Sequence, residues 1–127
     1  MDSNDKPQVL EFPRFCDPRG NLSFIQNMDQ APFEIKRVEW LYDLPADTAL
    51  PSRRFRRKRQ LLLPLAGSFD ARVTSPEGVE SVFHLSRAYR GVYVPATWTV
   101  DINNIAGNTV IAILSSTIDD PDEPDTF

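Results

Sequence analysis

Histidine and cysteine are nearly absent from this chain: its 127 residues include one of each. The single cysteine, Cys16, excludes a disulfide bond within the chain. The single histidine, His84, cannot supply the several nitrogen ligands that a transition-metal site commonly uses, and we interpret it as a surface or rim residue. We therefore expect no bound metal and no cofactor.

Long apolar runs are missing as well. No stretch approaches the ~20 residues that a membrane-spanning helix needs. Residues 1–8 are polar and lack the apolar region of a signal peptide. We therefore expect a cytoplasmic protein with no membrane partner. The formal net charge of −4 argues against a general nucleic-acid binder, so no nucleic acid is expected as a partner.

Glycine is scarce, with five residues against eleven prolines, and helical periodicity is almost absent. The apolar segments are short, rich in β-branched or aromatic residues, and often alternate with polar ones, as strands do. The predicted strands are residues 21–25, 33–42, 60–65, 68–74, 79–85, 91–95 and 109–115. Many short strands separated by turn signals are typical of an all-β sandwich or barrel.

The strand pattern defines one domain, residues 9–118, between a flexible N-terminus (1–8) and an acidic C-terminal tail (119–127). The tail contains five acidic residues and two prolines, which is typical of a solvated chain end. Asp119, Asp120 and Asp122 could bind a cation weakly, but the solvated tail is the favoured interpretation.

Residues 53–59 form a basic run, Arg-Arg-Phe-Arg-Arg-Lys-Arg. Strand alternation would place one set of side chains on one face and the rest on the other; the first set is Arg53, Phe55, Arg57 and Arg59. Three interpretations stay open: an anion site that uses arginine to bind phosphate, an exposed basic edge that discourages aggregation, and a nucleic-acid patch. The anion site is slightly favoured, and inward arginines would require an anion or acidic partners.

Three stretches together resemble a known family. They are residues 17–25 (Asp-Pro-Arg-Gly-Asn-Leu-Ser-Phe-Ile) with 32–38, residues 65–70 (Leu-Ala-Gly-Ser-Phe-Asp), and residues 91–95 (Gly-Val-Tyr-Val-Pro) with Trp98. In order and spacing they are similar to the WxcM-like cupins, which include thymidine-diphosphate-4-keto-6-deoxyglucose 3,4-ketoisomerases. The resemblance implies a cupin double-stranded β-helix (jelly roll) with a pocket inside the barrel. It also implies a homodimer, which would cover apolar edge strands such as 21–25.

The sequence departs from the family pattern at one segment. Similar isomerases carry Gly-Gly-His-Ala-His before the strand that leads into Gly-Ser-Phe, and ungapped counting from Gly67 matches the two histidines to Arg53 and Phe55. Moving a ketone from C4 to C3 requires a base and an acid that titrate near neutral pH. Arginine stays protonated and phenylalanine has no proton to give. Because losing such a group typically costs ~10²–10⁴-fold in rate, we expect weak or lost isomerase activity.

The ligand-binding candidates include residues that match family positions and arginines of the basic run. They are Arg37, Arg53, Arg57, Arg59, Arg87, Tyr93 and Trp98. Tyr93 and Trp98 could stack on a base or sugar ring, although large aromatic side chains at a barrel mouth are more often core. Glu39 and Trp40 stand where the family has two tyrosines. Glu39 is the one carboxylate that could replace the lost base, but a rim glutamate is the favoured interpretation.

Three functions therefore compete. The favoured one is a nucleotide-sugar 3,4-ketoisomerase-like cupin that binds a nucleotide diphosphate sugar, with thymidine diphosphate the expected nucleotide, and has weak or lost isomerase activity. The first alternative is an active ketoisomerase with a rewired acid/base pair. The second is a non-catalytic structural or interaction cupin.

Overall fold

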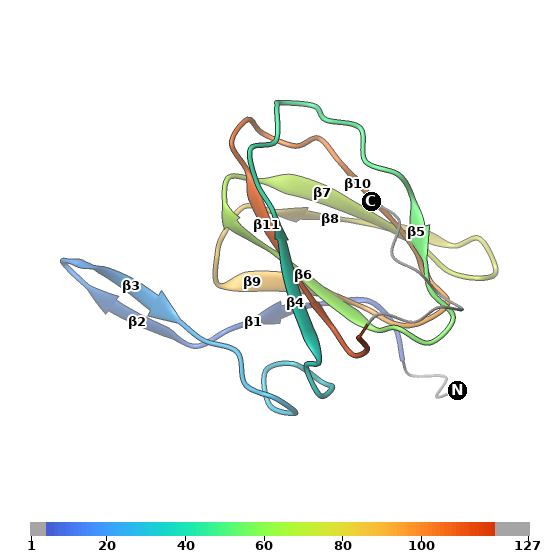
Figure 1. The fold of residues 1–127 in the computed structure, drawn as a ribbon, viewed down its shortest axis with the longest axis horizontal. Coiled ribbons are helices and arrows are strands. Elements are labelled where there is room, and N and C mark those ends of the chain that lie inside the picture. Colours follow the sequence, from blue (N-terminus) through green and yellow to red (C-terminus); the bar gives the residue numbers. More distant parts are fainter. Residues whose placement is uncertain (1–4, 119–127) are drawn as a thin grey trace.

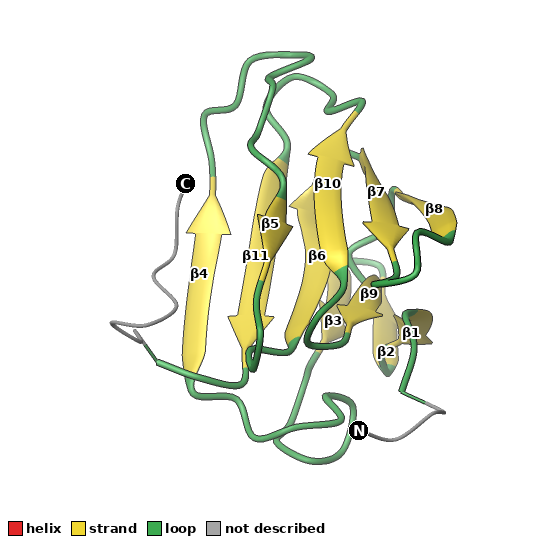
Figure 2. Ribbon diagram, turned by 90° about the vertical axis from the view of Figure 1, so that its right-hand side faces the viewer, coloured by secondary structure: helices red, strands yellow, loops and turns green. Residues whose placement is uncertain are grey.

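The computed structural model describes residues 5–118, and it contains strands but no helix in that range (Figures 1 and 2). This part of the chain therefore contains no candidate membrane-spanning helix. The strands are β1 (Gln8–Glu11), β2 (Arg14–Asp17), β3 (Gly20–Ser23), β4 (Arg37–Leu41), β5 (Arg53–Arg54), β6 (Gln60–Ala66), β7 (Phe69–Thr74), β8 (Glu80–Leu85), β9 (Arg90–Val94), β10 (Thr99–Asn103) and β11 (Val110–Ser115). The all-β prediction is confirmed.

The strands form two main antiparallel sheets and one separate hairpin. The five-stranded sheet has the order β1-β9-β6-β11-β4, and the four-stranded sheet has the order β5-β10-β7-β8. Side chains from both sheets, such as Leu62 and Ile113 from the first and Phe69 and Val100 from the second, form the core between them. The hairpin β2–β3 projects away from both sheets, as Figure 1 shows.

The two sheets differ in how their faces are covered. In β7, Phe69, Ala71 and Val73 are buried and the intervening residues are more exposed, because only one face meets the core. In β6, five consecutive residues from Gln60 are buried. Its even-numbered residue Leu62 enters the core between the sheets, whereas its odd-numbered neighbours enter a second core with Phe33 on the outer face. The central strands of the five-stranded sheet, β9, β6 and β11, are therefore buried on both faces, whereas its edge strand β4 exposes its outer face.

Most predicted strands are present with shifted ends, and four strands were missed. The predicted strand 33–42 is shorter, since β4 begins at Arg37 and Phe33 instead packs in the outer core. The predicted strand 21–25 ends at Ser23. The missed strands are β1, β2, β5 and β10. Of these, β10 carried a usable signal, because its buried residues Val100 and Ile102 alternate with partly exposed ones.

The turn between β6 and β7 depends on Gly67, whose φ is +80°. A Cβ at this position would lie 2.8 Å from the Thr109 Cα and even closer to the Thr109 side chain. Gly78, in the β7–β8 turn, has a φ of +94° but open space around its missing Cβ. Substitution of either glycine would strain the backbone, but only at position 67 would the added Cβ also collide with a neighbouring residue.

We predict that Gly67→Ala lowers the free energy of unfolding by about 2 kcal/mol or more, because strain and collision with backbone add. Gly78→Ala, with strain alone, should cost about 1 kcal/mol. Urea unfolding of both variants measures the difference. Equal losses would show that the Thr109 contact is relieved at no cost.

Candidate functional site

Polar side chains collect at one end of the inner face of the five-stranded sheet. Ser115 on β11 is the cross-strand partner of Gln60 on one side and of Arg37 on the other. Two residues further along their strands, Leu62 and Ile113 belong to the core between the sheets. Because side chains alternate along a strand, Gln60 and Ser115 also face inward. Both are buried, with 2% and 0% exposure.

Glu39 lies one row deeper than Arg37 on β4. It is the cross-strand partner of Ile113, and Leu41, two residues on, is in the inner core. The Arg37 Nη2 and Glu39 Oε2 atoms are 3.6 Å apart, and both side chains are partly buried. The structure thus places Glu39 inward, in an ion pair at the polar end of the barrel.

The four-stranded sheet contributes Arg53. Arg53 on β5 is the cross-strand partner of Val100, an inner-core residue, and only 8% of Arg53 is exposed. Phe55 is buried as well, whereas Arg54 between them is exposed. The Thr97 amide donates a 2.7 Å hydrogen bond to the Phe55 carbonyl. Thr97 has a φ of +74°, a strained backbone conformation for a β-branched residue.

The basic run does not keep one alternation throughout. A bend at residues 56 and 57 leaves Arg57 exposed and buries Lys58, of which 2% is exposed. The Lys58 Nζ lies 4.5 Å from the centre of the Phe55 ring. Arg59 instead lies over the Phe33 ring in the outer core, at 5.6 Å. The predicted shared face is therefore wrong beyond Phe55, because the bend shifts the alternation by one residue.

We call these inward side chains the inner polar cluster. It consists of Arg37, Glu39, Arg53, Lys58, Gln60, Thr97 and Ser115. Four of its buried atoms have no hydrogen-bond partner among the described residues: Glu39 Oε1, Gln60 Nε2, Thr97 Oγ1 and Ser115 Oγ. A buried polar group without a partner costs about 1–3 kcal/mol. Their gathering at one end of the barrel is typical of a site that a polar ligand completes.

The other predicted ligand-binding residues lie in three places. Trp98 is partly buried and packs against the core between the sheets. Tyr93 lies on the opposite face of the five-stranded sheet, with its ring centre 6.2 Å from that of Phe33. Arg59 is on that same outer face. The structure therefore does not bring Tyr93 and Arg59 together with Arg53, and the sequence signal at Tyr93 is explained by its packing.

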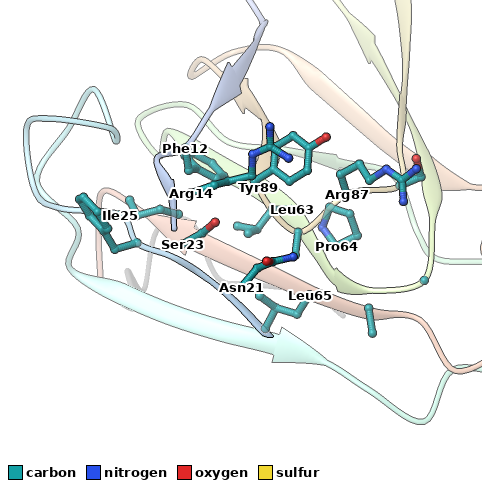
Figure 3. A pocket seen from close by; sticks show the side chains of 15 residues that line it. Phe12, Arg14, Asn21, Ser23, Ile25, Leu63, Pro64, Leu65, Arg87 and Tyr89 are labelled. Carbon is teal, nitrogen blue, oxygen red and sulfur yellow. The ribbon is translucent and has the colours of Figure 1, made fainter. Parts of the chain in front are cut away.

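Arg87 lines a separate cavity of about 750 Å³ between the hairpin β2–β3 and the body of the protein (Figure 3). Its walls are mainly apolar, with Phe12 and Leu63 from the body, and Arg14 enters from the hairpin. The Arg14 guanidinium carbon lies 3.9 Å from the centre of the Tyr89 ring. This cavity lies outside the core between the sheets.

His84 lies on the outer face of the four-stranded sheet. Its Nδ1 is 2.6 Å from Asp70 Oδ1, and Asn104 donates to the other carboxylate oxygen of Asp70. The His84 side chain is 58% exposed, and the strand places it away from the inner polar cluster. Within residues 5–118, no group of three or more His, Cys, Asp or Glu side chains could hold a metal ion. Asp119, Asp120 and Asp122 lie outside the described residues.

Two antiparallel sheets around a core with one polar end make this an all-β barrel of the cupin type. A family model described as FdtA, WxcM-like, C-terminal, matches residues 5–124, and the chain belongs to this family. The predicted resemblance is confirmed, and so is the cupin-like jelly-roll fold.

Comparison with known proteins agrees. The chain is 30% identical over 111 residues, 86% of its length and 78% of the relative's, to the TDP-4-oxo-6-deoxy-α-D-glucose-3,4-oxoisomerase of Aneurinibacillus thermoaerophilus. Its fold is similar to that of the WlaRB TDP-quinovose 3,4-ketoisomerase from Campylobacter jejuni, with a TM-score of 0.87 at 23% identity over 97% of this chain and 92% of that one. A variant of the 3,4-ketoisomerase QdtA from Thermoanaerobacterium thermosaccharolyticum, in complex with TDP-4-keto-6-deoxyglucose, gives 0.83 at 24% identity, with 97% and 87% covered.

The outer-face tyrosine generates a pH prediction. The Tyr93 hydroxyl donates a 2.8 Å hydrogen bond to Asp5. Burial first, and then this hydrogen bond, raise the pKa of Tyr93 from 10.0 to about 12, while Arg59 acts in the opposite direction. Between these two pH values the unfolded chain has released the proton and the folded chain still holds it. Tyr93 therefore makes its full contribution to the free energy of unfolding below pH 10, and this contribution is lost as the pH rises towards 12.

We predict that the stability difference between the natural protein and Tyr93→Phe shrinks as the pH rises. At about pH 9 the variant should be less stable by about 1 kcal/mol, the value of one hydrogen bond. Urea unfolding of both proteins between about pH 9 and about pH 11 measures the change, with other titrating groups cancelling in the difference. A constant difference would contradict the assigned shift.

Proposed function

We propose that the polar end of the barrel binds a nucleotide diphosphate sugar, with thymidine diphosphate as the nucleotide, and that 3,4-ketoisomerase activity is weak or lost. The observation that carries the proposal is the inward position of Arg53 and Phe55 within an otherwise retained family fold. Solved relatives in complex with TDP or a TDP-sugar support the ligand class.

The chemistry of the inner polar cluster supports the loss of activity. It contains no histidine, and the chain's only histidine, His84, lies on the outer face of the other sheet. Arg53 cannot accept the C3 proton, because arginine stays protonated. Glu39 is the carboxylate in the cluster, and it is ion-paired with Arg37. The alternative function, an active isomerase with a rewired acid/base pair, would use Glu39.

The second alternative is a structural or interaction cupin. Both this alternative and the favoured function expect the protein to form a homodimer. The edge strand β4 exposes Val38 and Trp40, and Tyr42 just after its end is exposed too; the exposed fractions are 52%, 57% and 62%. The hairpin β2–β3 exposes Phe15 and Leu22. An apolar edge strand that nothing covers promotes pairing with another chain, and these surfaces support a homodimer. The unpartnered polar atoms at the barrel end favour a ligand-binding role over a purely structural one.

We predict that TDP at millimolar concentration raises the melting temperature, and that the shift falls as salt rises, since cations attract the diphosphate. Arg53→Gln should weaken TDP binding about tenfold or more, because a charge-assisted hydrogen bond is removed from a buried position. Arg54→Gln, on the same strand but exposed, is the matched control and should change affinity less than about threefold. No thermal shift with any nucleotide diphosphate would refute the binding proposal.

We predict that the purified protein converts TDP-4-keto-6-deoxyglucose to the 3-keto sugar at least about 10²-fold more slowly than an isomerase of the family assayed beside it, because the proton-transfer groups are missing. The variant Arg53→His with Phe55→His should gain activity if the rest of the site is intact. Product formation followed by NMR is the measurement. Robust turnover by the natural protein would refute the loss of catalysis and favour the Glu39 alternative.

A further inference from the structure

The charges of the chain are divided unevenly along the sequence. All 14 basic residues lie before residue 91, and six of them fall in the basic run, residues 53–59. Five of the 18 acidic residues lie together in the acidic tail, residues 119–127, which contains no basic residue. The net charge of −4 therefore conceals one strongly positive segment and one strongly negative segment, which attract each other where the fold brings them close.

The fold brings the start of the acidic tail beside the basic run. The Ser116 amide donates a 3.0 Å hydrogen bond to the Arg59 carbonyl, and the Arg59 amide donates a 2.9 Å hydrogen bond to Ser116 Oγ. Only Thr117 and Ile118 separate this contact from residue 119, and Ile118 is exposed. The tail, fully extended, spans about 30 Å and the basic run at most about 25 Å. The acidic tail therefore has the reach to lie along the whole run.

The basic run offers cations at the surface. Arg56 and Arg57, at the bend between β5 and β6, are exposed. Both also interact with other groups of the protein, and they stay exposed despite these interactions. An exposed ion pair strengthens an association by about fivefold at most, so a free acidic peptide would bind here weakly. A tethered segment has an effective concentration on the order of 1 mM, which favours the chain's own tail as the occupant.

The acidic tail also begins next to the residues of the proposed ligand site. Ser115, which directly precedes Ser116, belongs to the inner polar cluster and is the cross-strand partner of Gln60. At the other end of the run is Arg53, which the proposed function assigns to the nucleotide diphosphate. Carboxylates and phosphates bind arginine through the same forked geometry. A tail that follows the run from Arg59 towards Arg53 would therefore compete with the diphosphate.

We propose that the acidic tail docks on the exposed cations of the basic run, and that a nucleotide diphosphate must displace it to bind. The docking rests on the charges and contacts above, whereas the displacement also rests on the proposed function. The tail acts as an internal competitor that excludes weakly charged anions and yields to a ligand with several negative charges. A solvated tail that makes no contact with the run is the opposing outcome.

A spin label on the acidic tail tests the docking directly. Because Cys16 is a free, exposed thiol, Thr126→Cys is made in a Cys16→Ser background, which leaves one labelling site in the full chain. We expect broadened NMR signals for the amides of residues 54–57, and recovery of these signals at high salt. The amides of Arg19 and Gly20, in the hairpin that projects away from the sheets, should stay sharp (Figure 1). Sharp signals at residues 54–57 would overturn the docking.

Two controls show which cations and which tail are involved. Arg56→Gln with Arg57→Gln should remove most of the broadening, whereas Arg87→Gln with Arg90→Gln, exposed cations outside the run, should keep it. Broadening that survives the first pair would overturn the assigned surface. Spin-labelled chains without isotopes are also mixed with isotope-labelled chains without a spin label. Broadening in this mixture would show that the tail of a second copy docks, and would overturn the assignment to the same chain.

Neutral variants test the competition with the ligand. In one variant the acidic residues of the tail are replaced by Asn or Gln: Asp119, Asp120, Asp122, Glu123 and Asp125. The matched control replaces five exposed acidic residues elsewhere in the same way: Glu11, Asp29, Glu34, Asp43 and Asp47. By titration calorimetry the neutral tail should bind TDP about threefold to tenfold tighter than the natural protein does. The control should change the affinity less than about twofold, because the salt screens distant charges. Equal affinities of the two variants would overturn the competition.

The experiments separate this inference from the proposed function. If TDP binds but leaves the broadening at residues 54–57 unchanged, the ligand does not displace the tail, and the competition is wrong. If TDP binds neither the natural protein nor the neutral-tail variant, the nucleotide function fails and the displacement fails with it. Broadening that salt removes would still support the docking in that case.

Discussion

The rest of the structure depends on one constraint, the burial of the central strands of the five-stranded sheet on both faces. Strand β6 sends Leu62 into the core between the sheets and Leu61 and Leu63 into the outer core, so a shift of one residue would exchange the two cores. This fixes the register at the end of the sheet, where Gln60 and Ser115 are cross-strand partners. Gln60 and Ser115 are thus placed by the packing of apolar residues further along their own strands.

The same alternation sorts the basic run. Arg59 lies on the same face of the sheet as Leu61 and over Phe33 in the outer core, whereas Gln60 lies on the same face as Leu62 and points inward. A regular strand would have placed Arg57 with Arg59. The bend at residues 56 and 57 leaves Arg57 exposed and lets Lys58 bury beside Phe55. One local departure from strand geometry therefore decides which cation of the run is buried beside Phe55.

The sequence predicted the all-β fold and most strand positions, because these follow from period-two alternation and the spacing of turns. It left open whether the basic run faces the barrel or the solvent. It did not predict the burial of Lys58, because no residue pattern indicates the bend at residues 56 and 57. It also grouped Tyr93 with the pocket, because a single aromatic in an apolar strand reads the same on either buried face. Gln60 and Ser115 were missed because each looks like an ordinary strand residue until the register makes them neighbours.

Binding and proton transfer require different properties, and this site retains groups suited to the first. Fixed cations and hydrogen-bond donors can hold an anion at any pH near neutrality, whereas proton transfer needs a group that exchanges its proton there. The orphaned atoms of Gln60, Thr97 and Ser115, and the strained backbone of Thr97, each destabilise the ligand-free fold. A ligand that satisfies the donors recovers part of that free energy, so occupancy and stability rise together. The features that weaken the barrel at this end are therefore the same ones that a bound polar ligand would satisfy.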